Sequence, residues 1–164
     1  MKNTEFIQHK IYTLPQLLHK VASLRVTGTT IAFTNGCFDI LHEGHIFSLS
    51  EAAKEADFLI VGVNSDTSVC KLKGPERPVN NEQSRSLILA SLLIVDAVMI
   101  FGEDTPLELI TSIKPDVLVK GGDYTIDRVV GSDVVLQNGG RVVITPFVQG
   151  FSTTGLIEKI RKLG

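Results

Sequence analysis

The sequence predicts an α/β fold, with one open, doubly wound sheet of five parallel strands in a single domain over residues 1–164. Short segments made almost entirely of Val, Ile, Leu, Phe and Ala alternate with segments of helical periodicity. Strands of this composition are typical of parallel sheets that are buried on both faces. The 164 residues suffice for one domain and are too few for two ordinary ones. No repeat or low-complexity linker marks an internal boundary.

The first helix is predicted over about residues 14–25 and is expected to pack on this domain. Thr13 is a candidate N-cap, and Pro15 is tolerated in a first turn, where a backbone N–H would have no helical partner. Apolar side chains follow at helical spacing, at Leu14, Leu17, Leu18, Val21 and Leu24. After Gly28, a short apolar run predicts a strand over residues 31–34.

Helices and strands continue to alternate in the middle of the chain. Helical periodicity predicts helices over residues 44–56 and 81–93, and apolar runs predict strands over residues 58–63 and 97–101. The helix over 44–56 carries its apolar face at Ile46, Leu49, Ala52 and Ala53.

The same pattern extends to the C-terminus. Thr105 is predicted to cap a helix that starts with Pro106. The further predicted elements are the end of that helix at residue 113, strands over 117–119 and 141–145, a short helix over 131–138 closed by Gly139 and Gly140, and a last helix after Ser152. With right-handed crossovers, such a sheet binds ligands outside the carboxyl ends of its strands. We therefore expect the functional residues in the loops that follow the strands.

Composition excludes several functional classes. Sixteen basic and eighteen acidic residues give a formal charge of -2, so no general field attracts nucleic acid or an anionic membrane. Cys37 and Cys70 lack the spacing of a disulfide framework or a four-cysteine zinc site. No apolar run approaches the ~20 residues that span a bilayer. We expect a cytoplasmic protein that binds neither nucleic acid nor membrane.

The loop TNGCFDILHEGH, residues 34–45, carries most of the candidate chemistry. Asn35-Gly36 between apolar runs is a strong hairpin signal, so a β-hairpin over residues 31–41 is one interpretation. Against it, residues 37–41 lack strand alternation and lead directly into a predicted helix.

His42 and His45 are three residues apart and therefore lie on one face of the first turn of that helix. The free N–H groups and the dipole of a helix start favour an anion, and Gly44 lets a phosphate approach the backbone closely. Beside a polyphosphate, the protonated imidazoles would be favoured and would act as charged donors. A metal site that includes Cys37, or histidines without a role, are the alternatives.

The loop resembles the motif of nucleotidyltransferases that carry His-x-Gly-His, because the preceding strand and Gly-x-Phe-Asp are also present. Further segments are similar to the bacterial heptose-1-phosphate adenylyltransferase unit and extend the resemblance over nearly the whole chain. They are VGVNSDTSVCKLKGPERPVN, VDAVMIFGEDTPLELI, PDVLVKGGDY, VVGSDVV and STT. The resemblance implies a Rossmann-like domain, and the chain looks like the stand-alone form of the unit.

The resemblance implies that a sugar-phosphate oxygen attacks the α-phosphorus of ATP and releases pyrophosphate. It assigns catalysis to His42, His45 and Lys73. It assigns nucleotide binding to Thr34, Asn35, Gly36, Cys37, Phe38, Asp39, Gly121, Asp123, Ser152, Thr153 and Thr154. Asp39 would fix the loop and is the one candidate metal ligand. Mg²⁺ is the implied cofactor, and a homo-oligomer is compatible with the sequence.

Basic residues are the candidates for the phosphates. Lys71 and Lys73 are expected in a flexible loop after the second strand, where Lys73 is preferred and two solvated lysines are the alternative. Arg77 and Arg85 can each offer a bidentate fork to the acceptor phosphate, and Arg85 is preferred because a helix would hold it. With Arg85, the resemblance implies Lys120 and Asp66 as acceptor-binding residues.

The C-terminal motif bears on the choice of nucleotide. Ser152, Thr153 and Thr154 open the last helix and supply more hydroxyls than capping needs, so a second anion site is predicted there. The segment 147–151 lacks the arginine that cytidylyltransferases place before this motif, which argues for ATP. The alternatives are a cytidylyltransferase for glycerol phosphate or another polyol or sugar phosphate, and a non-catalytic nucleotide-binding module.

Overall fold

A computed structural model describes residues 5–146 and 150–163. In chain order, its elements are η1 (Glu5–Lys10), α1 (Leu14–Val26), β1 (Ile31–Gly36), α2 (Glu43–Ala53), β2 (Phe58–Asn64), α3 (Asp66–Lys73), α4 (Glu82–Ala90), β3 (Ala97–Phe101), α5 (Leu107–Ile113), β4 (Val117–Gly121), η2 (Ile126–Arg128), α6 (Ser132–Gln137), β5 (Arg141–Thr145) and α7 (Thr153–Arg161). The elements η1 and η2 are short 3-10 helices.

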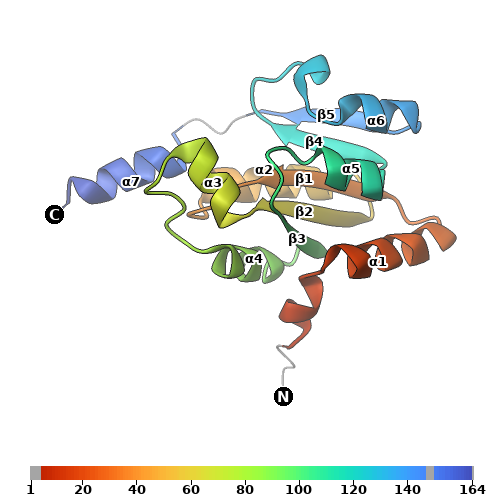
Figure 1. The fold of residues 1–164 in the computed structure, drawn as a ribbon. Helices are drawn as coiled ribbons and strands as arrows, with labels where there is room; N and C mark the ends of the chain where they lie inside the picture. Colours follow the sequence, from red (N-terminus) through yellow and green to blue (C-terminus); the bar gives the residue numbers. More distant parts are fainter. Residues whose placement is uncertain (1–4, 147–149, 164) are drawn as a thin grey trace.

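Within the described residues, five parallel strands form a sheet in the order β3-β2-β1-β4-β5 (Figure 1). The predicted α/β class and the parallel sheet are confirmed. The strand order reverses direction between β1 and β4, because the chain first builds outward through β2 and β3 and then returns to the other side of β1. Ligands of open α/β sheets bind at such a switch point, beyond the carboxyl ends of the strands.

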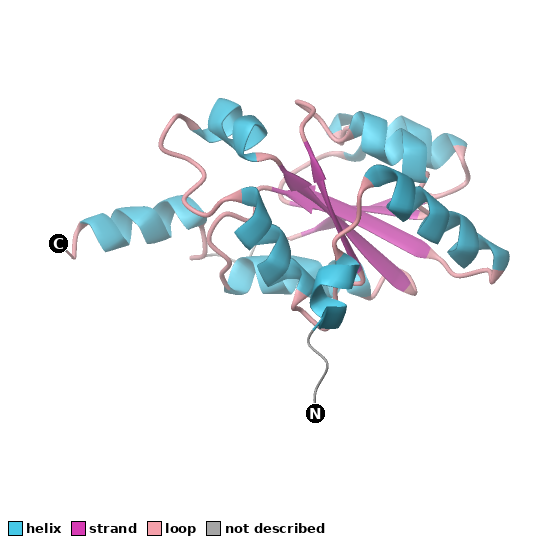
Figure 2. Ribbon diagram, turned by 60° about the horizontal axis from the view of Figure 1, so that its bottom comes forward, coloured by secondary structure: helices cyan, strands magenta, loops and turns pink. Residues whose placement is uncertain are grey.

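Helices cover both faces of the sheet (Figure 2). On one face, buried side chains of α1, α5 and α6 pack with residues such as Phe33 and Ile60. On the other face, α2 and α4 pack Leu49 and Leu89 against residues such as Val61. The strands are therefore buried on both sides, which explains why their sequences are continuous apolar runs and do not alternate.

The first helix begins as its sequence predicts. Its N-cap is Thr13, whose backbone N–H and hydroxyl both donate to Gln16 Oε1. Leu17 and Val21 are buried against the sheet, so α1 packs on it as expected.

The hairpin interpretation is wrong. Asn35 and Gly36 are the last residues of β1 and pair in parallel with Gly62 and Val63 of β2. Because the strand includes these residues, the loop that begins at Cys37 lies at the carboxyl edge of the sheet.

Several predicted boundaries also need correction. Residues 66–73 form the helix α3 where a loop was expected, with Ser65 Oγ accepting from the Ser68 N–H at 3.2 Å. Helix α5 has Pro106 as its N-cap, one residue later than predicted. Ile46 departs from the predicted apolar face of α2, since it is 37% exposed in the first turn.

Candidate active site

A cleft of about 380 Å³ opens beyond the carboxyl ends of β1 and β4, where the strand order reverses. Its walls come from the loop after β1, the first turns of α2 and α7, the end of α3 with the following segment, and the end of β4. The lining residues are Gly36, Cys37, Phe38, Asp39, His42, Gly44, His45, Ser48, Lys73, Arg77, Lys120, Gly121, Tyr124, Phe151, Ser152, Thr153 and Thr154.

The two motif histidines stack at the start of α2. His42 is the N-cap and His45 lies in the first turn, with ring centroids 3.8 Å apart and an interplanar angle of 22°. Gly44 makes room for this stack, since a Cβ there would lie 3.2 Å from the His42 ring and from Phe151 Cβ. The Nδ1 atom of each ring is buried without a hydrogen-bond partner in the described structure. Both rings thus have unused polar atoms at a helix N-terminus.

Burial keeps both histidines neutral in the absence of a ligand. Burial and the nearby His42 ring lower the pKa of His45 from 6.5 to about 4, and burial also lowers the pKa of His42. The protonated rings expected from the sequence belong to a different state, in which a polyphosphate is bound. Its negative charge would favour the cationic forms and so raise both pKa values.

Asp39 holds the loop after β1 in place. Its carboxylate accepts hydrogen bonds from Arg77 Nε at 2.6 Å, from Val79 N at 2.8 Å and from Asn80 N at 2.9 Å. These contacts lower the pKa of Asp39 although burial alone would raise it. The side chain is 1% exposed, so the carboxylate serves to stabilise the loop.

Basic side chains from two segments line the cleft. Lys73 is the last residue of α3, Arg77 follows it, and Lys120 lies near the end of β4. Lys120 Nζ donates to Asn35 Oδ1 at 3.3 Å, and burial lowers the pKa of its ammonium group. Apart from Asp39, which is paired with Arg77, the described lining residues include no carboxylate. The cleft is therefore suited to an anion.

The N-terminus of α7 forms another wall. Ser152 is the N-cap, and its Oγ accepts from Gly155 N at 3.0 Å. Thr153 and Thr154 follow it and also line the cleft. Of the segment that bears on nucleotide choice, residues 147–149 lie outside the described residues.

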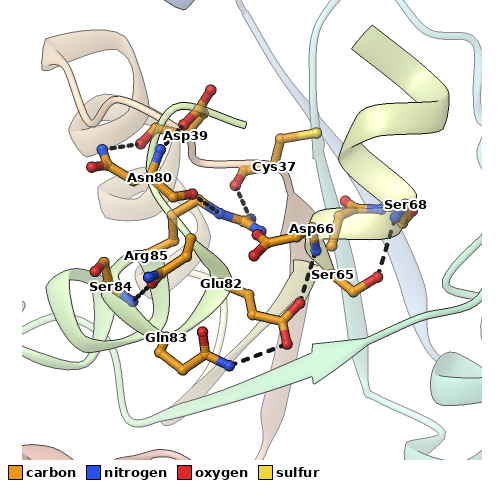
Figure 3. A network of polar contacts seen from close by, with 12 residues as sticks. Cys37, Asp39, Ser65, Asp66, Ser68, Asn80, Glu82, Gln83, Ser84 and Arg85 are labelled. Atoms are coloured by element: carbon orange, nitrogen blue, oxygen red, sulfur yellow. Dashed lines mark hydrogen bonds and ion pairs between the residues drawn. The ribbon is translucent and has the colours of Figure 1, made fainter. Parts of the chain in front are cut away.

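Arg85 and Asp66 do not reach the cleft, which corrects their expected contact with the acceptor. Arg85 is fully buried, and its guanidinium donates to Cys37 O at 2.6 Å, to Asn80 O at 3.0 Å and to Asp66 Oδ1 at 2.8 Å (Figure 3). Arg85 therefore stabilises the loop after β1 through the Cys37 carbonyl and does not contact the cleft. Arg77, the less favoured arginine in the sequence argument, is the one that lines the cleft.

Other predicted ligands also lie apart from the cleft. Thr34 is buried within β1, and the described lining residues of the cleft do not include Thr34 or Asp123. Asn35 lines a neighbouring cavity of about 140 Å³, and its Oδ1 accepts a hydrogen bond from Lys120 Nζ, which lines both the cavity and the cleft. The remaining predicted residues come together as expected, although their roles as ligands stay predictions.

Comparison with known proteins decides the family. Residues 33–159 match the cytidylyltransferase-like family. The chain belongs to it. The resemblance to nucleotidyltransferases, and with it an enzymatic activity of that class, is confirmed.

Curated relatives within this family are bifunctional proteins named HldE. The chain is 56% identical to HldE of Caulobacter vibrioides over 151 residues, which are 92% of this chain and 31% of the relative. It is 59% identical to HldE of Rhodospirillum rubrum over 133 residues, 81% of this chain and 27% of the relative. The chain thus spans about a third of the length of the curated relatives it matches.

Solved structures support the fold. A lipopolysaccharide core biosynthesis protein from Thermoplasma volcanium superposes with a TM-score of 0.60 at 27% identity, covering 74% of this chain and 98% of its own. A pantoate-beta-alanine ligase from Francisella tularensis gives a TM-score of 0.63 at 19% identity, with coverage of 93% and 77%, and this similarity concerns the fold alone. No helix among the described residues is long and apolar enough to cross a bilayer.

Three residues that line the cleft are absent from the ligands predicted from the sequence. Ser48 lies one turn after His45 on α2, and Phe151 precedes the capping serine of α7. Tyr124 ends the Lys120 motif, and Lys120 Nζ lies 5.9 Å from its ring centroid. The helical spacing of Ser48 from His45 could have indicated its position, whereas no local pattern brings Phe151 to the His42 ring.

Proposed function

We propose that this chain is an adenylyltransferase that transfers AMP from ATP to heptose 1-phosphate, giving ADP-heptose and pyrophosphate. The observation that carries the proposal is the stacked pair of His42 and His45 at a helix N-terminus, facing a cleft with basic side chains on its other walls. A sugar phosphate as the acceptor is supported by the HldE relatives and by the similarity to a lipopolysaccharide core biosynthesis protein.

In this reaction a phosphate oxygen of the acceptor attacks the α-phosphorus. The bond from the α-phosphorus to the oxygen that bridges to the β-phosphate breaks, and pyrophosphate leaves with that bonding pair. His42, His45 and the first N–H groups of α2 would stabilise the charge on the equatorial oxygens. Lys73, Arg77 and the start of α7 would hold the leaving pyrophosphate. Catalysis then consists of positioning and electrostatic stabilisation, without a covalent enzyme intermediate.

Mg²⁺ is proposed to enter as part of the substrate, bound to the triphosphate. In the described part of the chain, no three His, Cys, Asp or Glu side chains form a metal-binding group. The Asp39 carboxylate is occupied by Arg77, Val79 and Asn80, so it does not fit the role of metal ligand. Mg²⁺ commonly binds to substrate phosphates and keeps several waters, which agrees with a cleft that supplies cations and hydroxyls.

ATP is proposed as the preferred nucleotide. The segment from Lys120 to Tyr124 resembles the heptose type, and both ends of this segment line the cleft. Comparable kcat/KM values for ATP and CTP would contradict this choice and favour a cytidylyltransferase.

A panel of four nucleoside triphosphates against several sugar 1-phosphates and glycerol phosphate, read by pyrophosphate release, tests the proposal. We expect release with ATP and heptose 1-phosphate, and release at background level from a His45→Ala variant. Turnover only with CTP and glycerol phosphate would identify the alternative substrates. Binding of ATP without turnover of any acceptor would indicate a nucleotide-binding module.

A further inference from the structure

Phe38 has a backbone conformation that is rare for its residue type. Its φ is 47°. Among the described residues other than glycine, Lys114 is the only further one with a positive φ. The left-handed region is unfavourable for a bulky side chain, and such residues persist only where their surroundings enforce the conformation. Phe38 lies in the loop after β1 and lines the cleft.

The residues on both sides of Phe38 are held by side chains of Asn80 and of α4. The carbonyl of Cys37 accepts from Arg85 Nη1 at 2.6 Å, and the carbonyl of Asp39 accepts from Asn80 Nδ2 at 2.8 Å (Figure 3). The Asp39 carboxylate is held separately, by Arg77 and by backbone N–H groups. The loop is thus fixed immediately before and immediately after the left-handed residue.

Arg85 is itself fixed at several points. Its side chain is fully buried, Nε donates to Asn80 O at 3.0 Å, and Nη2 pairs with Asp66 Oδ1 at 2.8 Å. Asp66 in turn donates its backbone N–H to Glu82 Oε2 at 2.8 Å. A buried guanidinium that donates to two carbonyls and one carboxylate is a rigid group, because moving it would leave buried polar atoms unsatisfied.

The conformation of Phe38 determines what lies against His45. The Phe38 ring meets the His45 ring edge to face, with centroids 5.4 Å apart and an interplanar angle of 60°. Phe38 is 8% exposed, and a Cβ at Gly36 would come within 3.1 Å of its ring, so the ring fills its place closely. With φ in the ordinary negative range, the side chain would leave this position. His45 would then lose one wall of its environment.

We propose that Arg85 and Asn80 are positioning residues that hold Phe38 in its left-handed conformation, so that the Phe38 ring fixes His45 against His42. This inference rests on the proposed function only in taking His45 as a catalytic group. It also gives the buried arginine a role that needs no contact with substrate.

The pKa of His45 reports on its surroundings and can be measured directly. The ionisable groups that line the cleft with it are His42 on its own helix, Cys37 and Asp39 in the loop, Lys73 and Arg77 on one wall, Lys120 on β4, and Tyr124 after β4. Burial is the main cause of the low pKa of His45. If the Phe38 ring departs and water enters, the pKa of His45 should therefore rise toward 6.5.

The experiment is an NMR titration of the full chain without nucleotide, with the His45 signal assigned from a His45→Gln variant. We expect Asn80→Ala and Arg85→Gln to raise the pKa of His45 by roughly one to two units and to lower kcat by about tenfold. Phe38→Leu should raise the pKa similarly. Adding Arg85→Gln to Phe38→Leu should then change the pKa of His45 no further, because the Phe38 ring that Arg85 helps to hold is already absent.

Arg25→Gln is a matched control. Arg25 also donates to backbone carbonyls at a left-handed residue, those of Lys114 itself and of the preceding Ile113, but these residues do not line the cleft. This variant should leave the pKa of His45 and kcat unchanged.

An unchanged pKa of His45 in folded Asn80→Ala and Arg85→Gln proteins would overturn the proposal. Arg85 and Asn80 would then have a purely structural role. If Arg85→Gln does not fold, Asn80→Ala decides, since its side chain supplies one bond to the loop. Failure of the proposed function would appear separately, as the absence of pyrophosphate release from the unmodified chain, and would not affect the titration.

Discussion

Helices α2 and α7 both begin at the cleft, yet the rest of the protein holds them very differently. Helix α2 buries Leu49 and Ala52 against the sheet. None of the described residues of α7 is buried, and the helix extends away from the sheet (Figure 1). The first turn of α2 carries imidazole rings, whereas the first turn of α7 carries hydroxyl groups.

This difference indicates that the N-termini of the two helices have different functions. Groups that stabilise a transition state must be held in place before the reaction, and α2 provides a packed support for them. Groups that bind the outer phosphates can tolerate more freedom, because their contacts form with the ground state as well. Changes at α2 should therefore affect kcat, and changes at α7 should affect mainly the KM for the nucleotide.

The largest effect is expected for His42→Ala and His45→Ala. Each should lower kcat by about 10²–10³-fold, equivalent to about 3–4 kcal/mol of transition-state stabilisation, while far-UV circular dichroism stays unchanged. Steady-state pyrophosphate release measures the loss. A variant that keeps more than about a tenth of the kcat, a loss below roughly 1.4 kcal/mol, would show that its histidine does not have this role.

The packed support of α2 should also appear in the pH dependence of stability. The pKa of His45 is lowered to about 4 in the folded chain, so between pH 6.5 and 4 the unfolded chain binds more protons than the folded one. The free energy of unfolding should fall as the pH decreases through this window, by at most about 2–3 kcal/mol from this group. The lowered pKa of Asp39 acts in a separate window, below its ordinary value of 3.8.

Urea unfolding at several pH values measures this dependence, with His45→Gln as the comparison. The variant should lose much of the slope between pH 6.5 and 4 and keep the slope below pH 3.8. An identical profile for the two proteins would show that His45 has an ordinary pKa.

Lys73→Ala should have an intermediate effect. Lys73 lines the cleft, whereas Lys71 pairs with Asp104 at 2.8 Å and is not among the described lining residues. Replacing Lys73 should lower kcat/KM for ATP by about 10–30-fold, or about 1.4–2 kcal/mol, and leave the melting temperature nearly unchanged because an exposed lysine contributes little to folding. Lys71→Ala is the matched control. Equal activities of the two variants would reduce Lys73 to a solvated helix-end lysine.

Sequence patterns identified the features that depend on neighbouring residues. The strands β3 and β5 have the predicted bounds, because continuous apolar runs identify doubly buried strands. The His42 motif was found because its residues are consecutive along the chain. These are features for which local sequence and tertiary burial agree.

Features that depend on distant partners were missed. Helix α3 buries only Ser68 and Val69, so it shows no apolar period. Arg85 was expected to bind the acceptor phosphate, whereas its guanidinium pairs with Asp66 and Cys37, which are far away in the sequence. Only the folded chain shows that the charge of Arg85 is compensated.

The smallest effect is expected at α7. Thr153→Val keeps the shape of the side chain and removes the hydroxyl from the cleft, whereas Ser152 continues to cap the helix through Gly155 N. We expect a rise in the KM for ATP of about 3–10-fold, corresponding to about 0.7–1.4 kcal/mol for one hydrogen bond, with kcat nearly unchanged. Thr111→Val on α5, at an exposed residue outside the lining of the cleft, is the control. A loss of kcat as large as that of His45→Ala would contradict the division between the two helices, because the hydroxyl at α7 would then act in the transition state.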